Sequence, residues 1–364
     1  MDQGMNGRHS ETNGTILGRN WPQSLESVYF SIGPLFSWTL IATGTVGTTG
    51  NILTLLVYSR LGFSSTIYIS YTALAVSDLF CVLSSMVFGL RYMRSPLPNL
   101  SAQVSDEVLR LVGVYPHFAF SRTTGLLTAW ISLERCLCVI FPTRVKLMIS
   151  RTVTKLTIIA IFLIGCFPLV FLYGVYRIER QFDPNSNATS FTFLRHGGPL
   201  QEKLESTALF LFSVVYPTLS CVSVTVCTVA LIIKLRHSTR WRKLNATAAN
   251  AQQGKSSSQN AQTSTRETRV TRVVIIVAGV FLICSLPTAA HLLAVATIDG
   301  YSNTGYLRYL RWINGMVTVL FAQVNSSLNI VIFATSGQRF RAVLFQILTG
   351  CVYTRSSHGK DQHL

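Results

Sequence analysis

The sequence predicts an all-α integral membrane protein: a bundle of seven membrane-spanning helices, followed by a short amphipathic helix in the membrane interface. Of the 364 residues, 49% are hydrophobic and only 12% are charged, and the mean hydropathy is +0.40. This composition is too apolar for an ordinary soluble domain. Seven segments also approach the roughly 20 apolar residues that a helix needs to cross the hydrocarbon.

The seven predicted spans follow one another with short connections, apart from one long polar linker. They cover residues 35–59, 66–92, 107–140, 153–176, 206–235, 270–297 and 309–335. The third span is the least apolar, because it carries Arg110, His117 and Arg122. After the seventh span, Phe340 and the apolar residues that follow it at helical spacing oppose Arg339, which indicates a helix lying in the interface.

The distribution of charge predicts an extracellular N-terminus and a cytoplasmic C-terminus. In this orientation 19 Lys and Arg residues lie on the cytoplasmic side and 12 outside, as expected for short cytoplasmic loops. Of the acidic residues, ten lie outside and three inside, and Asp78 remains within the membrane. Such a basic inner surface suits anionic membrane lipid or an acidic protein face, so we expect no nucleic-acid partner.

Three regions are predicted to lie outside the compact bundle of residues 35–335. Residues 1–34 form an extracellular tail, and residues 336–364 form the interfacial helix and a cytoplasmic tail. Residues 237–268 are rich in Ser, Thr, Asn and Gln and lack apolar periodicity, so we expect a disordered third cytoplasmic loop.

Two kinds of covalent modification are predicted. Sequons place N-glycosylation at Asn13, Asn99 and Asn187, which all lie outside in the predicted orientation. Cys351, at the end of the interfacial helix, is a candidate for palmitoylation, and the alternative is a plain reduced cysteine.

Several short motifs occur in a fixed order along the spans. They are "GTTGN" ending at Asn51, "LAVSDLF" around Asp78, "ERC" from Glu134, Pro217 in the fifth span, "FLICSLP" from Phe281 to Pro287, and "NSSLNIVIF" from Asn325 to Phe333. This ordered set resembles the rhodopsin-like (class A) G-protein-coupled receptors over roughly residues 35 to 350. "ERCLCVIFPTRVK" together with "NSSLN" is most similar to gastropod chemosensory receptors and related invertebrate neuropeptide receptors.

The resemblance implies a signalling role for the charges at the inner end of the third span. Glu134 and Arg135 would couple to a heterotrimeric G protein, and Glu267 would bridge to Arg135 and hold the inactive state. The alternative for Glu267 is a capping box with Ser264 as the helix N-cap. An activation core is implied at Asn51, Asp78, Pro217, Phe281, Pro287, Asn325, Asn329 and Phe333. Arrestin and a receptor kinase would be further partners, at the plasma membrane.

Asp78 is costly within the membrane unless it is paired or hydrated. The resemblance places Thr124, Asn325, Ser326 and Asn329 near it, which would form an oxygen-rich site able to hold a sodium ion. The alternative is a protonated Asp78 in a hydrogen-bonded core. We expect no other cofactor.

Three departures from the family pattern change what the resemblance implies. Ser285 replaces the usual tryptophan of the sixth span, and Ile330 replaces a proline near the end of the seventh, which should straighten that helix. Phe333 replaces a tyrosine and so lacks its hydroxyl. No cysteine lies on the extracellular side, so the family's outer disulfide cannot form, and the outer loop of residues 177–205 should be less tethered.

The outer halves of the helices are expected to hold the ligand. The candidate pocket residues are His117, Phe118, Ser121, Arg122, Thr288, His291 and Trp312. His117 stands where amine receptors carry an aspartate, so an amine ligand would lack a counter-ion. Arg122 lies close to mid-membrane and could bind a carboxylate, although it could equally bond to backbone carbonyls.

The sequence favours a non-enzymatic receptor over two other classes. An enzyme is disfavoured because no close histidine pair, nucleophile with a base, or phosphate loop is present. A transporter or channel is disfavoured because the intramembrane charges are few and no matching halves with broken helices are seen. Chemosensation is the expected role, and a neuropeptide receptor of the same fold is the alternative.

Overall fold

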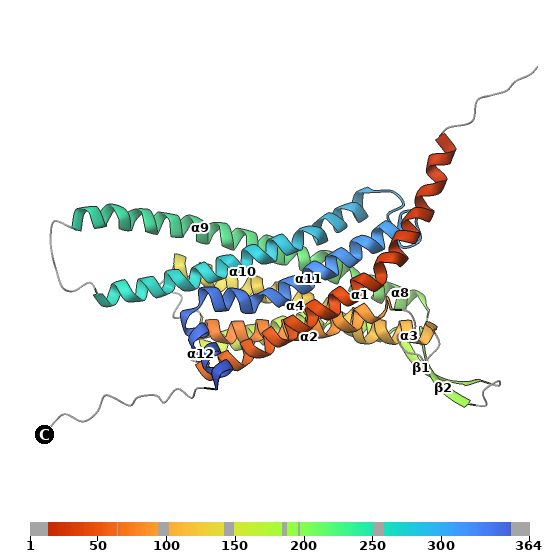
Figure 1. Cartoon of the computed structure of the whole chain (residues 1–364), viewed down its shortest axis with the longest axis horizontal. Helices are drawn as coiled ribbons and strands as arrows, with labels where there is room; N and C mark the ends of the chain where they lie inside the picture. The colour runs from red at the N-terminus through yellow and green to blue at the C-terminus, as the bar shows by residue number, and fades with distance from the viewer. Residues whose placement is uncertain are drawn as a thin grey trace, which may run out of the picture.

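The computed structural model contains seven helical segments long and apolar enough to cross a membrane, arranged side by side along one axis (Figure 1). The structure describes residues 14–63, 65–93, 102–141, 149–183, 188–195, 197–249 and 258–350, and their side chains over 24–63, 65–93, 106–141, 149–177, 197–237 and 270–350. This confirms the predicted all-helical membrane fold.

The spans are built from helices that in several cases run together end to end. The first two spans lie in α1 (Gly14–Leu61) and α2 (Thr66–Leu90), the third in α3 (Ala102–Leu109), the π-helical turn η1 (Arg110–Val114) and α4 (Tyr115–Ile140), and the fourth in α6 (Arg151–Cys166) and α7 (Pro168–Tyr173). The fifth comprises α8 (Pro199–Phe210), the π-helical turn η2 (Leu211–Val215) and α9 (Tyr216–Ala249); the sixth and seventh lie in α10 (Ser258–Thr297) and α11 (Arg308–Ser336), and α12 (Gln338–Thr349) follows.

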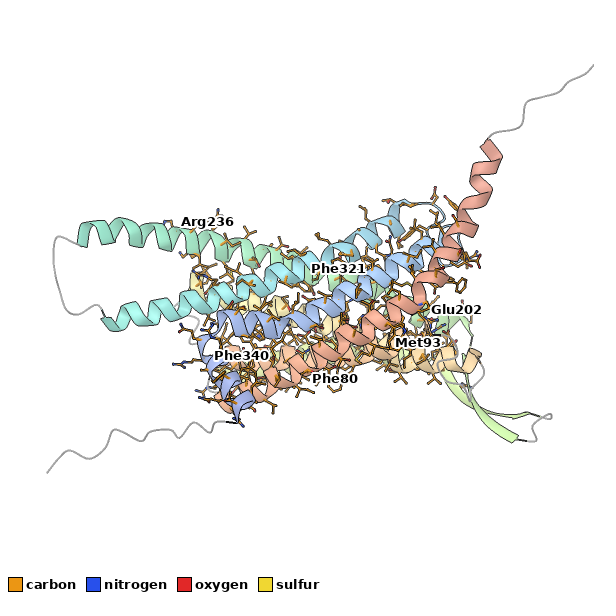
Figure 2. All side chains as sticks on the ribbon, in the orientation of Figure 1. Phe80, Met93, Glu202, Arg236, Phe321 and Phe340 are labelled. Atoms are coloured by element: carbon orange, nitrogen blue, oxygen red, sulfur yellow. The ribbon has the colours of Figure 1, made fainter. Side chains whose placement is uncertain are left out.

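The bundle is centred on α4, which packs against α2, α9, α6 and α10, while α1 packs against α2 and α11. Large apolar side chains remain exposed on the outer faces of these helices, among them Phe80 (Figure 2), Leu163 and Val226. In a bundle surrounded by lipid these exposed side chains face hydrocarbon and not water.

The first helix begins earlier than predicted. Residues 14–34, expected to be tail, are helical and continue into the span. Tyr29 explains part of this extension, because its ring packs against Tyr92, Tyr309 and Trp312 at the outer end of the bundle. Asn13 and Asn99, two of the predicted glycosylation sites, lie outside the described residues.

The predicted disordered loop of residues 237–268 is largely helical. Helix α9 continues to Ala249 and α10 begins at Ser258, so only residues 250–257 of this segment lie outside the described ones. Ala, Gln, Lys and Arg in these extensions are good helix formers even without an apolar face. Ser264 therefore lies inside α10 and not at its N-cap, which removes the capping-box alternative for Glu267.

The outer loop between the fourth and fifth spans contains a hairpin that the sequence analysis missed. Strands β1 (Tyr176–Asp183) and β2 (Ala188–Arg195) pair antiparallel, from Tyr176 opposite Arg195 to Asp183 opposite Ala188. Asn187, the third predicted glycosylation site, lies outside the described residues. The hairpin extends beyond the outer end of the bundle (Figure 1).

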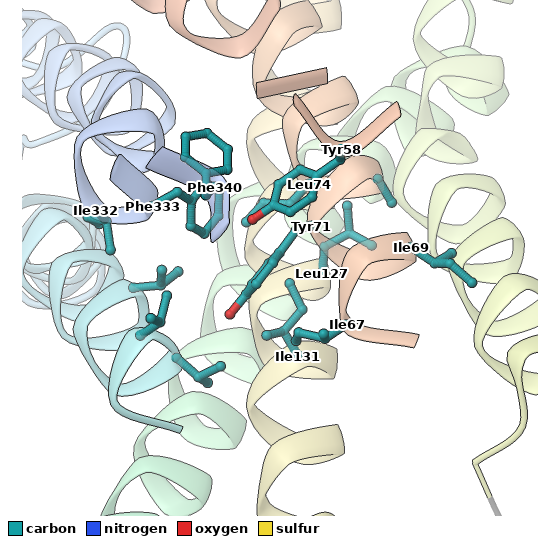
Figure 3. Close-up of a cluster of buried hydrophobic side chains, with 14 of the residues drawn as sticks. Tyr58, Ile67, Ile69, Tyr71, Leu74, Leu127, Ile131, Ile332, Phe333 and Phe340 are labelled. Atoms are coloured by element: carbon teal, nitrogen blue, oxygen red, sulfur yellow. The ribbon is translucent and has the colours of Figure 1, made fainter. Parts of the chain in front are cut away.

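The inner end of the bundle has an aromatic core. Tyr58 from α1, Tyr71 from α2, Phe333 from α11 and Phe340 from α12 are buried together (Figure 3). Phe340 is 4% exposed and anchors α12 to the bundle. The predicted interfacial helix is thus present, and α11 continues as helix through Ile330 to Ser336. Cys351 lies outside the described residues.

Candidate functional site

A buried polar layer surrounds Asp78 at the centre of the bundle. Its carboxylate accepts a hydrogen bond from the Thr124 hydroxyl at 2.9 Å and another from the Asn329 side-chain amide at 2.6 Å. Asn51 donates to the backbone oxygen of Ser326 at 3.0 Å. The layer therefore joins α1, α2, α4 and α11 through groups that the sequence analysis had placed together.

The same layer offers oxygen ligands of the kind that a sodium ion prefers. The Ser326 hydroxyl faces the Asp78 carboxylate and is buried without a hydrogen bond of normal geometry. Of the two predicted asparagine ligands, Asn329 donates its side-chain amide to Asp78, whereas Asn325 lines a neighbouring cavity and has no hydrogen bond to Asp78. Asp78, Thr124 and Ser326 thus fit a sodium site, which remains a proposal.

The charges at the inner end of α4 are paired with each other. Glu134 is fully buried and accepts hydrogen bonds from Thr66, from Ser70 at 3.1 Å and from Arg135 at 2.9 Å. Nε of Arg135 is buried without a partner in the described part of the chain. Glu267 lies in α10, but its side chain is outside the described residues, so the predicted bridge to Arg135 remains a hypothesis.

A cavity of about 230 Å³ lies between α4, α9, α10 and α11, beside the polar layer. Three predicted pocket residues line it, Ser121, Arg122 and Thr288. Residues of the predicted activation core line it as well: Pro217, Phe281 and Asn325. Further lining residues, absent from the predicted pocket, include Gly125, Ser220, Cys221, Cys284, Ser285 and Ala322. The small side chains that recur at helical spacing near Pro217 and Ser285 were the sequence feature that could have indicated lining residues.

Arg122 is held by the irregular turn of the fifth span. Its Nε donates to the backbone oxygen of Phe212 at 2.7 Å. In the π-helical turn the backbone amide of Tyr216 donates to the backbone oxygen of Leu211, five residues earlier. The same pattern would pair the Phe212 oxygen with the amide of residue 217, but Pro217 has no amide hydrogen. The freed carbonyl accepts the arginine instead.

The rest of the Arg122 guanidinium has no protein counter-charge among the described residues. Its only hydrogen bond there is the one to Phe212, and the salt bridges join other residues. One nitrogen of Arg122 therefore binds a backbone carbonyl, as one of the two sequence interpretations expects. Arg122 also lines the cavity, and binding of a carboxylate there stays a prediction.

Four predicted pocket residues do not line this cavity. His117 is 1% exposed and lies 3.4 Å from the backbone oxygen of Cys81, with Phe118 packed beside it in the outer core. His291 bonds to the Tyr301 hydroxyl at 3.1 Å, and Trp312 packs against Tyr29. They were selected by depth along a helix, and depth does not give the direction of a side chain.

Polar contacts tie the outer hairpin and the second span to the third. The Tyr176 hydroxyl donates to Glu107 at 2.8 Å and lies 3.2 Å from the Tyr115 hydroxyl. Burial, followed by these two contacts, raises the pKa of Tyr176 above its ordinary range, so it is a protonated donor at neutral pH. Arg91 forms two hydrogen bonds to Asp106. Side-chain hydrogen bonds of Tyr176 therefore hold the base of the hairpin.

Comparison with known proteins agrees with these features. Residues 50–333 match the model of the "7 transmembrane receptor (rhodopsin family)", which covers more than half of the 364 residues. A search of curated proteins found no match. The matched region includes the Asp78 layer, the Glu134–Arg135 pair and the cavity beside Arg122, and the chain therefore belongs to the rhodopsin family of seven-transmembrane receptors, which are not enzymes and signal through heterotrimeric G proteins.

Proposed function

We propose that this receptor lies in the plasma membrane with its N-terminus outside and senses small extracellular ligands that carry a free carboxylate, in chemosensation. The observation that supports this proposal most is the position of Arg122. Its guanidinium lines a cavity in the middle of the bundle and has no acidic partner among the described residues. A charge in this environment is costly until an anion binds.

The cavity favours a small ligand over a large one. Its volume of about 230 Å³ lies below the usual range for drug-sized molecules. Hydroxyls of Ser121 and Thr288 share its wall and could bind polar groups next to the carboxylate. Acidic amino acids and short organic acids fit these features best.

A neuropeptide receptor remains the second candidate, and one feature supports it. Tyr29, Tyr309 and Trp312 form an aromatic cluster at the outer end of the bundle. Such a cluster could bind peptide side chains while a terminal carboxylate reaches Arg122.

The cavity adjoins the signalling core. Phe281, Asn325 and Ser326 line it, and the backbone oxygen of Ser326 also accepts the hydrogen bond from Asn51 in the Asp78 layer. A ligand that moves α10 or α11 would therefore shift groups linked to the layer. Arg135 would then meet the G protein, and a receptor kinase and arrestin would end the response.

A ligand screen in transfected cells tests the proposal. Acidic amino acids and organic acids should evoke guanine nucleotide exchange, and Arg122→Gln should lower their potency by about 10- to 100-fold, because a charge-assisted hydrogen bond is lost. Arg177→Gln, at an exposed position of the outer hairpin, is the matched control and should leave potency unchanged. Unchanged potency in Arg122→Gln at normal surface expression, or a preference for cations, would reject the carboxylate site.

A further inference from the structure

The cavity beside Arg122 reaches the outer surface of the bundle between α9 and α10, which are neighbouring helices (Figure 1). Three of its lining residues are exposed: Thr218 and Val222 of α9 and Ala289 of α10. The Val222 side chain is the clearest case, because the residue is 57% exposed. A residue that lines a cavity and is also exposed marks an opening of that cavity. We call the gap bounded by these three residues the lateral opening.

The lateral opening lies within the membrane-spanning part of the bundle. Its residues belong to the segments Pro199–His237 and Val270–Thr297, which are long and apolar enough to cross a membrane. Large apolar side chains beside it are exposed as well, among them Leu219, Val226 and Leu286. In a bundle surrounded by lipid, such side chains contact hydrocarbon. The opening therefore leads from the cavity into the bilayer and not into water.

The sequence of the two helices explains why a gap remains between them. Pro287 lies inside α10, and Pro217 follows the π-helical turn at the start of α9. Prolines and π-helical turns bend helices or change the direction of their side chains. The residues next to these prolines, Thr218 and Ala289, have small side chains that do not fill the space. Two local irregularities at a similar depth thus leave the cavity open on this side.

On its outward side the cavity is bounded by packed apolar side chains. Tyr115, Phe212 and Val319 are buried members of one hydrophobic cluster. They lie on the third, fifth and seventh spans, and each precedes the first residue of its span that lines the cavity. Since these three spans run inward in the predicted orientation, the cluster lies between the cavity and the extracellular surface. The lateral opening is therefore a more direct path to Arg122 than the outer end of the bundle.

We propose that ligands reach Arg122 from the bilayer through the lateral opening, and that the receptor therefore prefers monocarboxylic acids with an unbranched apolar chain. This inference rests on the carboxylate site proposed above. The carboxylate lies at Arg122, and the chain passes between Val222 and Ala289 into the hydrocarbon. An acidic amino acid or a dicarboxylic acid carries a further charge, which this apolar path disfavours.

Both ends of such a ligand match their surroundings. The carboxylate accepts charge-assisted hydrogen bonds from the guanidinium of Arg122. The neutral form of the acid enters hydrocarbon far more easily than the carboxylate does, and the nearby cation then favours the ionised form. The chain remains in apolar surroundings throughout, so each added CH₂ group raises affinity from water by about fourfold.

Binding of a homologous series tests the proposal on the unmodified receptor. The probe is tritiated decanoate, bound to full-length receptor in phosphatidylcholine nanodiscs and corrected for empty nanodiscs. At equal aqueous concentration, octanoate should displace it about tenfold better than hexanoate. Tetradecanoate should still compete, because its chain continues into lipid. Decanedioate, with a second carboxylate at the far end of the chain, should compete at least about tenfold less well than decanoate. Equal competition by decanedioate, or no competition by tetradecanoate, would reject the lateral path.

A pair of matched variants tests the position of the opening. Val222→Trp narrows the gap and should slow the association of decanoate by about tenfold or more. Val226→Trp places the same side chain one turn further along α9, at an exposed position that does not line the cavity, and should bind like wild type. Melting temperatures of both variants report whether they fold. If both folded variants bind decanoate at the wild-type rate, the opening is not the path.

Arg122→Gln distinguishes a failure of this inference from a failure of the carboxylate site. We expect Arg122→Gln to weaken decanoate binding by about 10- to 100-fold. If acidic amino acids lose potency in Arg122→Gln while decanoate does not bind saturably to wild type, the carboxylate site stands and the lateral path is rejected. If decanoate and acidic amino acids are both unaffected by Arg122→Gln, the carboxylate site itself is wrong, and this inference fails with it.

Discussion

At the scale of single residues, several buried polar side chains form hydrogen bonds with partners from other helices. Asp78 bonds to Thr124 and Asn329, and Glu134 bonds to Thr66 and Ser70. Since lipid supplies no hydrogen bonds, each pairing specifies which helices must be neighbours. Arg122 follows the same rule, because Pro217 in the fifth span frees the Phe212 carbonyl that Arg122 binds.

Gln323 is a further residue of this kind. It is fully buried, donates to the backbone oxygen of Leu40 at 2.6 Å and to Thr43, and accepts from Ser85. We expect Gln323→Leu to lower stability by about 1–2 kcal/mol, since hydrogen bonds between membrane helices average about 0.6 kcal/mol each. A lower melting temperature of the purified receptor would show it. Val331→Ala, at an exposed position of the same helix, should change the melting temperature less; the reverse order would contradict the role of Gln323.

At the scale of elements, the outer surface combines a β-hairpin with a polar contact to the third span. The family places a disulfide between this loop and the third helix, but the described cysteines form no disulfide. Tyr176, at the start of β1, instead bonds to Glu107, near the outer end of that helix. A side-chain hydrogen bond thus holds the hairpin at its base. Water can replace this hydrogen bond, whereas it could not replace a disulfide.

This contact predicts a specific mutant effect. Tyr176→Phe removes only the hydroxyl, and we expect faster amide exchange in the hairpin together with a loss of stability of about 1 kcal/mol. Hydrogen exchange followed by mass spectrometry measures the first effect and thermal unfolding the second. Tyr306→Phe, at a tyrosine that is 62% exposed, is the matched control. Equal exchange in both variants would mean that the hairpin is held by other contacts.

At the scale of the whole molecule, periodicity and hydropathy predicted the seven spans and α12, because lipid imposes length and composition on each helix. The parts of helices that extend beyond the membrane, residues 14–34 and 237–249, were not predicted, because they have no apolar periodicity. The motifs predicted which residues meet around Asp78. They did not predict that His117 and Trp312 pack away from the cavity, because side-chain direction depends on packing with other helices.

The resting state of the receptor as a whole depends on how α10 meets α4 at the inner end. Thr271, Val274, Ala278 and Phe281 recur at helical spacing along α10 and are all buried. Glu267 precedes Thr271 by four residues, so it continues this inward face by one turn. Arg135, 15% exposed and with an unpaired Nε among the described residues, is the available cation on α4.

We therefore predict that Glu267→Gln raises ligand-independent signalling, because glutamine cannot form the ion pair that would hold α10 against α4. A partly exposed pair contributes about 0 to 1 kcal/mol, so basal nucleotide exchange should rise by up to about fivefold at equal surface expression. Arg269→Gln also removes one charge but lies about 200° around the helix from Glu267, and it should leave basal exchange near the wild-type level. If Glu267→Gln and Arg269→Gln behave alike, Glu267 does not hold the resting state, because position on the inward face would then make no difference.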